Sequence, residues 1–395
     1  MKKLIRDPNL DQLVEELNRT DAPGPRGIED VPSVLPPSTL AEGGAFEALL
    51  KEMCERGASD LLIVAGMPPV FRINGRLQQD ADREQMSADE VRIMLAAFTT
   101  GRLRERIEQD GAADLSLRAA GMRFRVNVHR QRGTFAASVR ALPTTVPTLP
   151  QLELPVTLAE LMKPTRGLVL LCGPTGSGKT TTLAALVGEI NRTSARHVIT
   201  IEDPIEYEHR NVSSVIEQVE IGRDAPTFAA ALRAALRQDP DVILVGEMRD
   251  LETVSIALTA AETGHLILAT LHTSDAAQAI HRIVDVFPPQ QQMQIRHQLA
   301  LSLNAIVCQH LVPRSDGGGR AAAVEVLLAN HAVRNHIRNE KLQNLVSEIT
   351  LGKRQGMISL EDSLATLVRR GAITPEDARI RAPRPDELES LLRSR

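Results

Sequence analysis

Aromatic side chains are scarce in this chain. Its 395 residues include seven phenylalanines, one tyrosine and no tryptophan. Proteins that hold single-stranded nucleic acid usually stack the bases on aromatic rings inside a basic groove. An excess of positive charge is missing too, because the formal net charge is −4. The composition therefore weighs against a helicase, and we expect no direct nucleic-acid partner.

Clustered cysteines and long apolar runs are also lacking. Cys54, Cys172 and Cys308 are far apart in the sequence and form no Cys-x-x-Cys pair, so neither a disulfide framework nor a zinc module is indicated. No stretch approaches the roughly 18 apolar residues that cross a membrane, and no hydrophobic signal segment follows the basic start. We expect a soluble cytoplasmic protein that reaches a membrane only through a partner.

The most informative motif present is the octapeptide at residues 173–180. It has the pattern Gly-x-x-x-x-Gly-Lys-Thr of a phosphate-binding loop, in which backbone N–H groups of glycine-rich turns converge on phosphate oxygens. Lys179 is expected on the β- and γ-phosphates, and Thr180 on Mg²⁺, so ATP and Mg²⁺ are the expected ligands. The predicted nucleotide-binding residues are Gly173, Pro174, Thr175, Gly176, Ser177, Gly178, Lys179, Thr180 and Thr181.

The surroundings of this motif favour an α/β fold. An apolar run at 168–172 precedes the loop, and apolar residues at helical spacing follow it. Further apolar runs at 197–201, 242–245 and 265–270 alternate with helical patterns. This alternation is typical of a parallel sheet covered by helices on both faces.

Proline-rich stretches divide the chain into predicted units. Residues 45–145 combine helical periodicity with alternating strand patterns and an Asn74-Gly75 hairpin turn, which predicts an α+β domain. Residues 21–44 are rich in proline and glycine, which predicts a linker, and a short amphipathic helix is predicted before them. The predicted units are an N-terminal helix and linker (1–44), the α+β domain (45–145), an interdomain linker (146–155), the ATPase domain with C-terminal helices (156–380) and a frayed tail (381–395).

Carboxylates follow two of the predicted strands. Glu247 ends the strand at 242–245, and Gly246 stands where an aspartate is usual. Glu206 closes the acidic stretch after the strand at 197–201. At one sheet edge with Lys179, Glu206 could deprotonate water, and Glu247 could hold Mg²⁺ through its hydration shell. The alternative interpretation of Glu247 is a surface glutamate in a turn. The alternative for the stretch with Glu206 is an acidic helix start.

Three segments resemble the signature motifs of the secretion and pilus ATPase superfamily. Residues 236–250 are similar to its defining signature, residues 199–207 to its aspartate box, and residues 264–273 to its histidine box. The resemblance is greatest to the branch of pilus retraction motors and covers roughly residues 45–380. It implies a RecA-like P-loop NTPase domain preceded by a small α+β, PAS-like domain.

The resemblance also implies roles for individual residues. Glu206 would be the catalytic base, Glu247 the second catalytic carboxylate and His272 a sensor of the nucleotide state. Arg132 and Arg140 best match the arginines that approach the phosphates at a subunit boundary. Solvated arginines on an exposed sheet are the alternative interpretation of these two, and a satisfied polar residue is the alternative for His272.

The function that the resemblance implies is a hexameric, Mg-dependent ATPase that powers type IV pilus retraction through an inner-membrane platform protein. The missing zinc module favours the retraction branch. Departures at Leu62, Val333, His336 and Asn339, with the extension at 1–44, leave an accessory or assembly-type ATPase open. A nucleic-acid translocase and a nucleotide-gated scaffold without hydrolysis are further alternatives.

Overall fold

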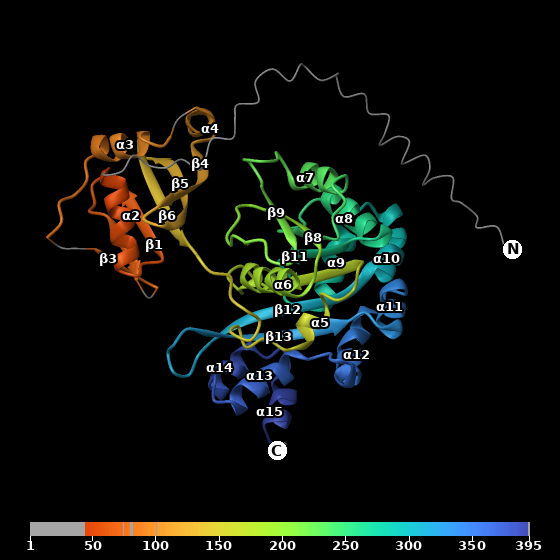
Figure 1. Cartoon of the computed structure of the whole chain (residues 1–395). Coiled ribbons are helices and arrows are strands. Elements are labelled where there is room, and N and C mark those ends of the chain that lie inside the picture. The colour runs from red at the N-terminus through yellow and green to blue at the C-terminus, as the bar shows by residue number, and fades with distance from the viewer. Residues whose placement is uncertain (1–43, 74, 80–81, 100, 394–395) are drawn as a thin grey trace, which may run out of the picture.

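The computed structural model describes residues 44–73, 75–79, 82–99 and 101–393. The helix expected near residues 10–17 and the linker up to residue 43 lie outside these residues, as does Asn74 of the predicted hairpin turn. Figure 1 shows two sheets at different places in the molecule, joined by the segment that leaves β6.

The first sheet is antiparallel, six-stranded and ordered β3-β2-β1-β6-β5-β4. Its alternating sequence buries one face, where Phe71, Phe124 and Leu50 pack in a hydrophobic core that is separate from the cores of the second sheet. The elements are α2 (Ala45–Glu55), β1 (Asp60–Val64), β2 (Val70–Ile73), β3 (Arg76–Gln79), α3 (Ala88–Ala96), α4 (Arg102–Asp110), β4 (Ala112–Ala119), β5 (Met122–Gln131) and β6 (Thr134–Leu142).

The second sheet has seven strands in the order β13-β12-β7-β11-β10-β8-β9. All neighbouring pairs are parallel except β12 and β13. Strands β7, β10 and β11 are buried throughout, as continuous apolar runs require. The strands are β7 (Gly167–Cys172), β8 (His197–Glu202), β9 (Val215–Glu220), β10 (Val242–Val245), β11 (Leu266–Leu271), β12 (Leu303–Pro313) and β13 (Arg320–Leu328).

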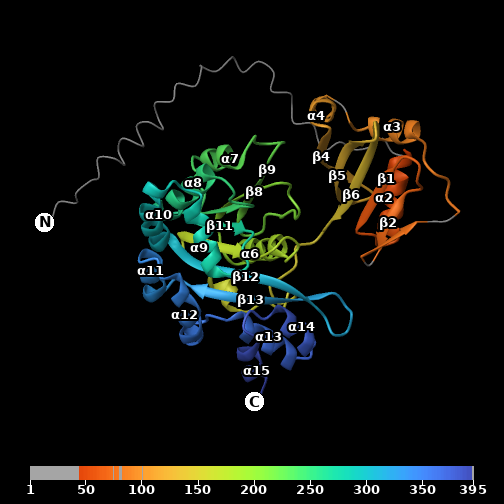
Figure 2. The ribbon, with the colours of Figure 1, turned by 180° about the vertical axis from the view of Figure 1, so that it is seen from behind.

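Helices cover both faces of this sheet. Leu168 and Leu170 pack with α7 to α10 on one face, and Val169 and Leu171 with α5 and α6 on the other. Figure 2 shows α8, α9 and α10 from behind. The helices are α5 (Thr157–Glu160), α6 (Lys179–Thr193), α7 (Phe228–Ala235), α8 (Leu251–Thr263), α9 (Ala276–Asp285) and α10 (Pro289–Ser302).

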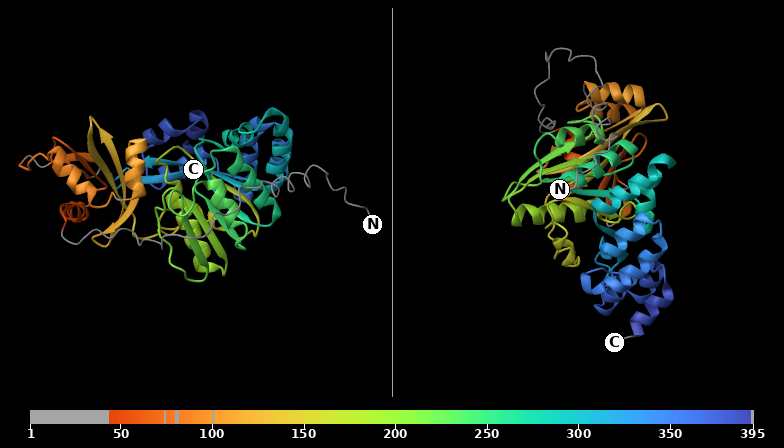
Figure 3. Two further views of the ribbon diagram at one scale, coloured as in Figure 1. Left: turned by 90° about the horizontal axis from the view of Figure 1, so that it is seen from above. Right: turned by 90° about the vertical axis from the view of Figure 1, so that its right-hand side faces the viewer.

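The C-terminal part is helical, as expected. Ser359 and Thr374 are N-caps that accept the backbone N–H three residues on. Figure 3 shows this part at the end of the molecule away from α3 and α4. Its helices are α11 (His331–Arg338), α12 (Leu345–Leu351), α13 (Leu360–Arg369), α14 (Pro375–Arg381) and α15 (Pro385–Arg393), with short 3₁₀ turns at Leu342–Asn344 and Gly352–Gln355.

The expectation of a frayed tail over 381–395 is wrong for residues 385–393. These residues form α15, and Leu388 is fully buried. The backbone N–H and side chain of Arg384 donate to the carboxylate of Glu361, which is itself fully buried. Charged residues near a chain end suggest fraying, but here a buried partner on α13 holds the helix start.

Candidate active site

The phosphate loop and the sequence-predicted Glu206, Glu247 and His272 all follow parallel strands. They come after β7, β8, β10 and β11, which are hydrogen-bonded neighbours in the order β7-β11-β10-β8. The carboxyl ends of parallel strands meet at one edge of a sheet, where open α/β folds bind ligands. The predicted site residues of the ATPase sheet therefore share one edge.

The phosphate loop has the backbone that its glycines permit. Gly173, Gly176 and Gly178 have φ values of 147°, 77° and 84°, which side-chain-bearing residues rarely adopt. Helix α6 begins at Lys179, so its first N–H groups and the positive end of its dipole face the loop. The loop can bind an anion where the motif predicts one.

A buried glutamine on β12 supports this loop. The Gln309 amide donates to the carbonyl of Ser177 at 2.7 Å and accepts the hydroxyl of Thr182 at 2.8 Å. A Cβ on Gly173 would lie 2.4 Å from the Gln309 carbonyl oxygen, and one on Gly178 would lie 2.9 Å from its amide nitrogen. Glycine is therefore required at both positions by close packing as well as by φ.

The residues of the loop fit a triphosphate. Lys179 is buried, and its Nζ donates to the carbonyls of Gly173 and Pro174 at 2.7 and 3.1 Å. Burial lowers the pKa of Lys179, while the nearby Cys172 and Glu247 oppose that shift. The hydroxyl of Ser177 is also buried, with no hydrogen-bond partner among the described residues. An ammonium and a hydroxyl with unmet hydrogen-bonding capacity suit phosphate oxygens.

Glu247 and His272 lie together. His272 Nε2 is 3.2 Å from Glu247 Oε1, and Arg249 Nε donates to the same carboxylate oxygen. Gly246 is close to β8, because a Cβ there would lie 3.0 Å from the carbonyl oxygen of Ile201. The glycine that replaces the usual aspartate therefore allows β8 and β10 to approach closely beside Glu247.

Glu206 faces the arginines of the antiparallel sheet. Burial raises the pKa of Glu206, and the positive charges of Arg125 and Arg140 lower it by smaller amounts. Arg125 and Arg140 are direct cross-strand partners on β5 and β6. Arg140 also donates to Asp60 at 2.9 Å. A partly buried carboxylate beside two guanidinium groups is a candidate base near developing negative charge.

A second carboxylate in the same acidic stretch is more deeply buried. Burial raises the pKa of Glu202 to about 7, although hydrogen bonds from Thr200 and Gln218 stabilise the charged form. Gln218 also donates to the carbonyl of Tyr207, so Glu202 is part of the hydrogen-bond network that holds the segment carrying Glu206.

Arg132 does not lie beside Arg140. It forms the turn between β5 and β6 with Gly133, and both residues have positive φ. Arg140 lies six strand steps beyond Thr134, where β6 leaves the turn, which at the strand rise is about 20 Å. The two predicted arginines are therefore at opposite ends of one hairpin and are not brought to the same place within one subunit.

Several site residues were not predicted from the sequence. Gln309 and His310 interrupt an apolar run, and this polar pair within a largely apolar strand was the available signal. Arg125 lies on β5, and its place near Glu206 depends on how the two domains meet. The hydroxyl of Tyr207 donates to Thr181 at 3.1 Å, which connects the segment after β8 to α6.

The sheet order and the loop define a RecA-like P-loop nucleotide-binding protein with an N-terminal α+β domain. The chain belongs to the type II/IV secretion system protein family, whose sequence model matches residues 44–374. The predicted fold class and the predicted superfamily are thereby confirmed.

Curated relatives cover most of the chain. A twitching motility protein of Neisseria gonorrhoeae is 44% identical over 326 residues, which are 82% of this chain and 87% of the relative. The type IV pilus retractation ATPase PilT of Pseudomonas aeruginosa is 42% identical over 86% of this chain and 98% of its own. The type IV pilus ATPase PilU of the same organism is 40% identical over 88% of this chain and 91% of its own.

Solved structures agree with this assignment. The crystal structure of the pilus retraction motor PilT with bound ADP matches with a TM-score of 0.81 and 45% identity, over 87% of this chain and 98% of that one. The ATPase DotB of Legionella pneumophila matches with a TM-score of 0.73 and 31% identity, over 85% and 94%.

Two features are absent from the described residues. None of their helices combines the length and apolar character needed to cross a bilayer. Nor do the same residues contain a group of three or more His, Cys, Asp or Glu side chains placed to hold a metal ion.

Proposed function

We propose that this protein is a Mg-dependent ATPase motor that powers type IV pilus retraction. It acts as a homo-hexameric ring in the cytoplasm, bound peripherally to the inner membrane through a pilus platform protein. We propose the domain limits 45–145, 146–155 and 156–380 for the α+β domain, the linker and the ATPase domain. The observation that carries the proposal is the shared sheet edge of the phosphate loop, Glu247 and Glu206.

The residues have separable roles in this proposal. The loop amides and Lys179 bind the phosphates of ATP, and Glu206 accepts the proton of the attacking water. Its raised pKa makes Glu206 a better proton acceptor than an ordinary glutamate. Glu247, held by Arg249 and His272, orients water near the γ-phosphate. His272 senses the nucleotide state because it shares this carboxylate.

Mg²⁺ fits the site through Thr180 and, by way of water, Glu247. When bound, the ion neutralises charge on the phosphates. Hydrolysis is coupled to movement of the α+β domain, whose arginines face Glu206 across the domain boundary. A nucleotide that binds the closed arrangement more tightly biases this movement.

The test is the substitution Lys179→Ala in the full chain. It removes the only ammonium on the loop, so phosphate release should fall by about 10²-fold or more. Single-turnover kinetics should show no burst of phosphate. Phosphate release by Lys179→Ala at the wild-type rate would refute the assigned site. If the unsubstituted protein binds ATP but does not hydrolyse it, a scaffold is favoured instead.

An accessory or assembly-type pilus ATPase is the second candidate. Two observations support this candidate. The chain matches the pilus ATPase PilU, and it departs from the retraction-type motif at Val333, His336 and Asn339. Deletion of the gene separates the candidates. Excess surface pili are expected if the motor retracts pili, and absent pili would point to assembly.

A further inference from the structure

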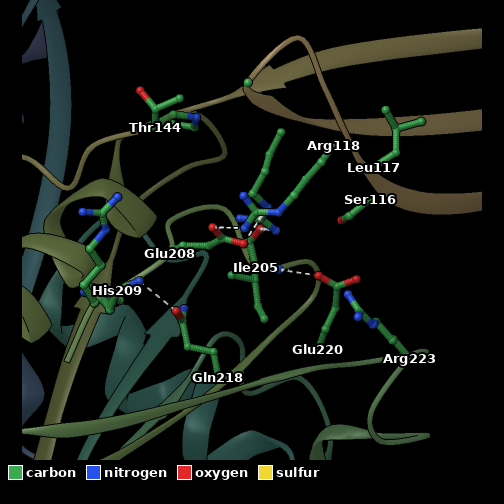
Figure 4. Close-up of a pocket in the computed structure, with 14 residues that line it drawn as sticks. Ser116, Leu117, Arg118, Thr144, Ile205, Glu208, His209, Gln218, Glu220 and Arg223 are labelled. Carbon is green, nitrogen blue, oxygen red and sulfur yellow. Dashed lines mark hydrogen bonds and ion pairs between the residues drawn. The ribbon is translucent and has the colours of Figure 1, made fainter. Parts of the chain in front are cut away.

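A cavity of about 570 Å³ lies outside the phosphate loop, at the boundary of the two domains. Its walls come from the β4–β5 hairpin, the segments that follow β6 and β8, and the end of β9 with the turn after it. The volume falls within the range of about 300–1,000 Å³ that is usual for small-molecule sites. Figure 4 shows the side chains that line it.

The cavity carries an excess of positive charge. Four arginines and two glutamates line it, which leaves two formal positive charges. Figure 4 shows Arg118 next to Glu208, and Arg223 near Glu220. The charged lining residues are Arg118, Arg123, Arg210, Arg223, Glu208 and Glu220.

Two polar atoms in this lining are buried and unsatisfied. Within the described part of the chain, neither Nη1 of Arg123 nor the hydroxyl of Ser116 has a hydrogen-bond partner. Leaving such groups unpaired is unfavourable, and more so for a charged one. Arg123 uses Nη2 to donate to the carbonyl of Ile205 at 2.9 Å and pairs with Glu208 through Nε at 3.1 Å, so both N–H groups of Nη1 remain without a partner among the described residues.

The arginines approach the cavity from different elements. Arg118 and Arg123 come from the β4–β5 hairpin, Arg210 from the segment after β8 and Arg223 from the turn after β9. A planar carboxylate matches one guanidinium fork, whereas the oxygens of a phosphate can accept from several directions at once. Donors that surround a space therefore suit phosphate better than carboxylate.

We propose that this cavity is a second ligand site, which binds a small anion carrying phosphate groups, separate from the nucleotide on the phosphate loop. The anion would bond to Arg123 and Ser116 and replace Glu208 as the partner of Arg118. The segment that carries Glu206 forms one wall, so an occupant lies where it can influence domain closure.

The test measures binding of inorganic pyrophosphate by the full chain with Lys179→Ala, without Mg²⁺, by calorimetry. This background disables the phosphate loop, so the result does not depend on the proposed function. We expect one pyrophosphate per chain. Arg123→Gln and Arg223→Gln should each weaken binding about tenfold or more, the loss of a charge-assisted hydrogen bond. Ser116→Ala should weaken it less.

Two further variants guard against misinterpretation. Arg92→Gln removes an exposed arginine on α3 that pairs with Asp89, and it should leave binding unchanged. Glu208→Gln removes the competing carboxylate and should tighten binding several-fold, a gain that a damaged fold would not produce. Binding that is absent in the Lys179→Ala background, unchanged by Arg123→Gln, or matched in strength by citrate would overturn the proposal.

Discussion

At the scale of single residues, the environment of Glu206 sets the pH at which it can act as a base. A base must be deprotonated, so turnover should fall as pH drops through the pKa of Glu206, which burial has raised. Arg140→Gln removes a charge that lowers this pKa. The acidic limb of the kcat profile should therefore move to higher pH in the variant, as measured by phosphate release across a pH series.

Arg130→Gln is the matched control for this shift. Arg130 lies on the same strand as Arg125, but its guanidinium packs over the Phe135 ring, 5.7 Å from the centroid. The acidic limb of the kcat profile of Arg130→Gln should coincide with that of the unsubstituted protein. An unmoved limb in Arg140→Gln would mean that Glu206 is not the titrating base.

At the scale of elements, Gln309 ties β12 to the phosphate loop. Gln309→Ala should leave the Ser177 carbonyl and the Thr182 hydroxyl without their present partners inside the protein. The loss is worth about 1–3 kcal/mol, so ADP affinity should fall about fivefold or more. Titration with ADP measures it. Gln292→Ala, which removes a hydrogen bond from α10 to the carbonyl of Phe287, should leave the affinity unchanged.

An ion pair with a buried carboxylate holds the start of the last helix. Arg384→Ala leaves Glu361 buried without its bidentate partner, which should cost about 3 kcal/mol. Urea unfolding and limited proteolysis should show α15 released first. Adding Glu361→Leu should restore much of the stability, because no unpaired charge then remains. Equal protease sensitivity in the single and double variants would count against this account.

The sequence predicted the central strands of the second sheet but not the strands toward its edges. Strands β7, β8, β10 and β11 are short apolar runs between turn signals, so their pattern is direct. The strands that were missed are β9, β12 and β13, which mix polar and apolar residues or carry isolated polar side chains. The roles of Gln309 and of α15 were missed for a second reason. Their partners, Ser177 and Glu361, come from distant parts of the chain, and only packing brings them together.

At the scale of the whole molecule, the position of Arg132 bears on the proposed ring. Arg132 is at the tip of the β5–β6 hairpin, about 20 Å from Arg140 by the strand rise. If Arg132 contacts phosphates, it must therefore do so in a neighbouring subunit. In that case Arg132→Ala and Glu206→Gln should each be nearly inactive alone, while equal mixtures of the two proteins should regain activity.

Random mixing predicts the size of the recovery. A site is complete when its own chain retains Glu206 and its neighbour retains Arg132, so about a quarter of the sites should work in rings with rotational symmetry. Mixtures of Lys179→Ala with Glu206→Gln are the control, because both changes affect the same site and no arrangement restores it. Recovery should require conditions in which subunits exchange. If exchanged mixtures of Arg132→Ala and Glu206→Gln stay inactive, Arg132 does not serve a neighbouring site, and the arginines beside Glu206 within one subunit remain the candidates.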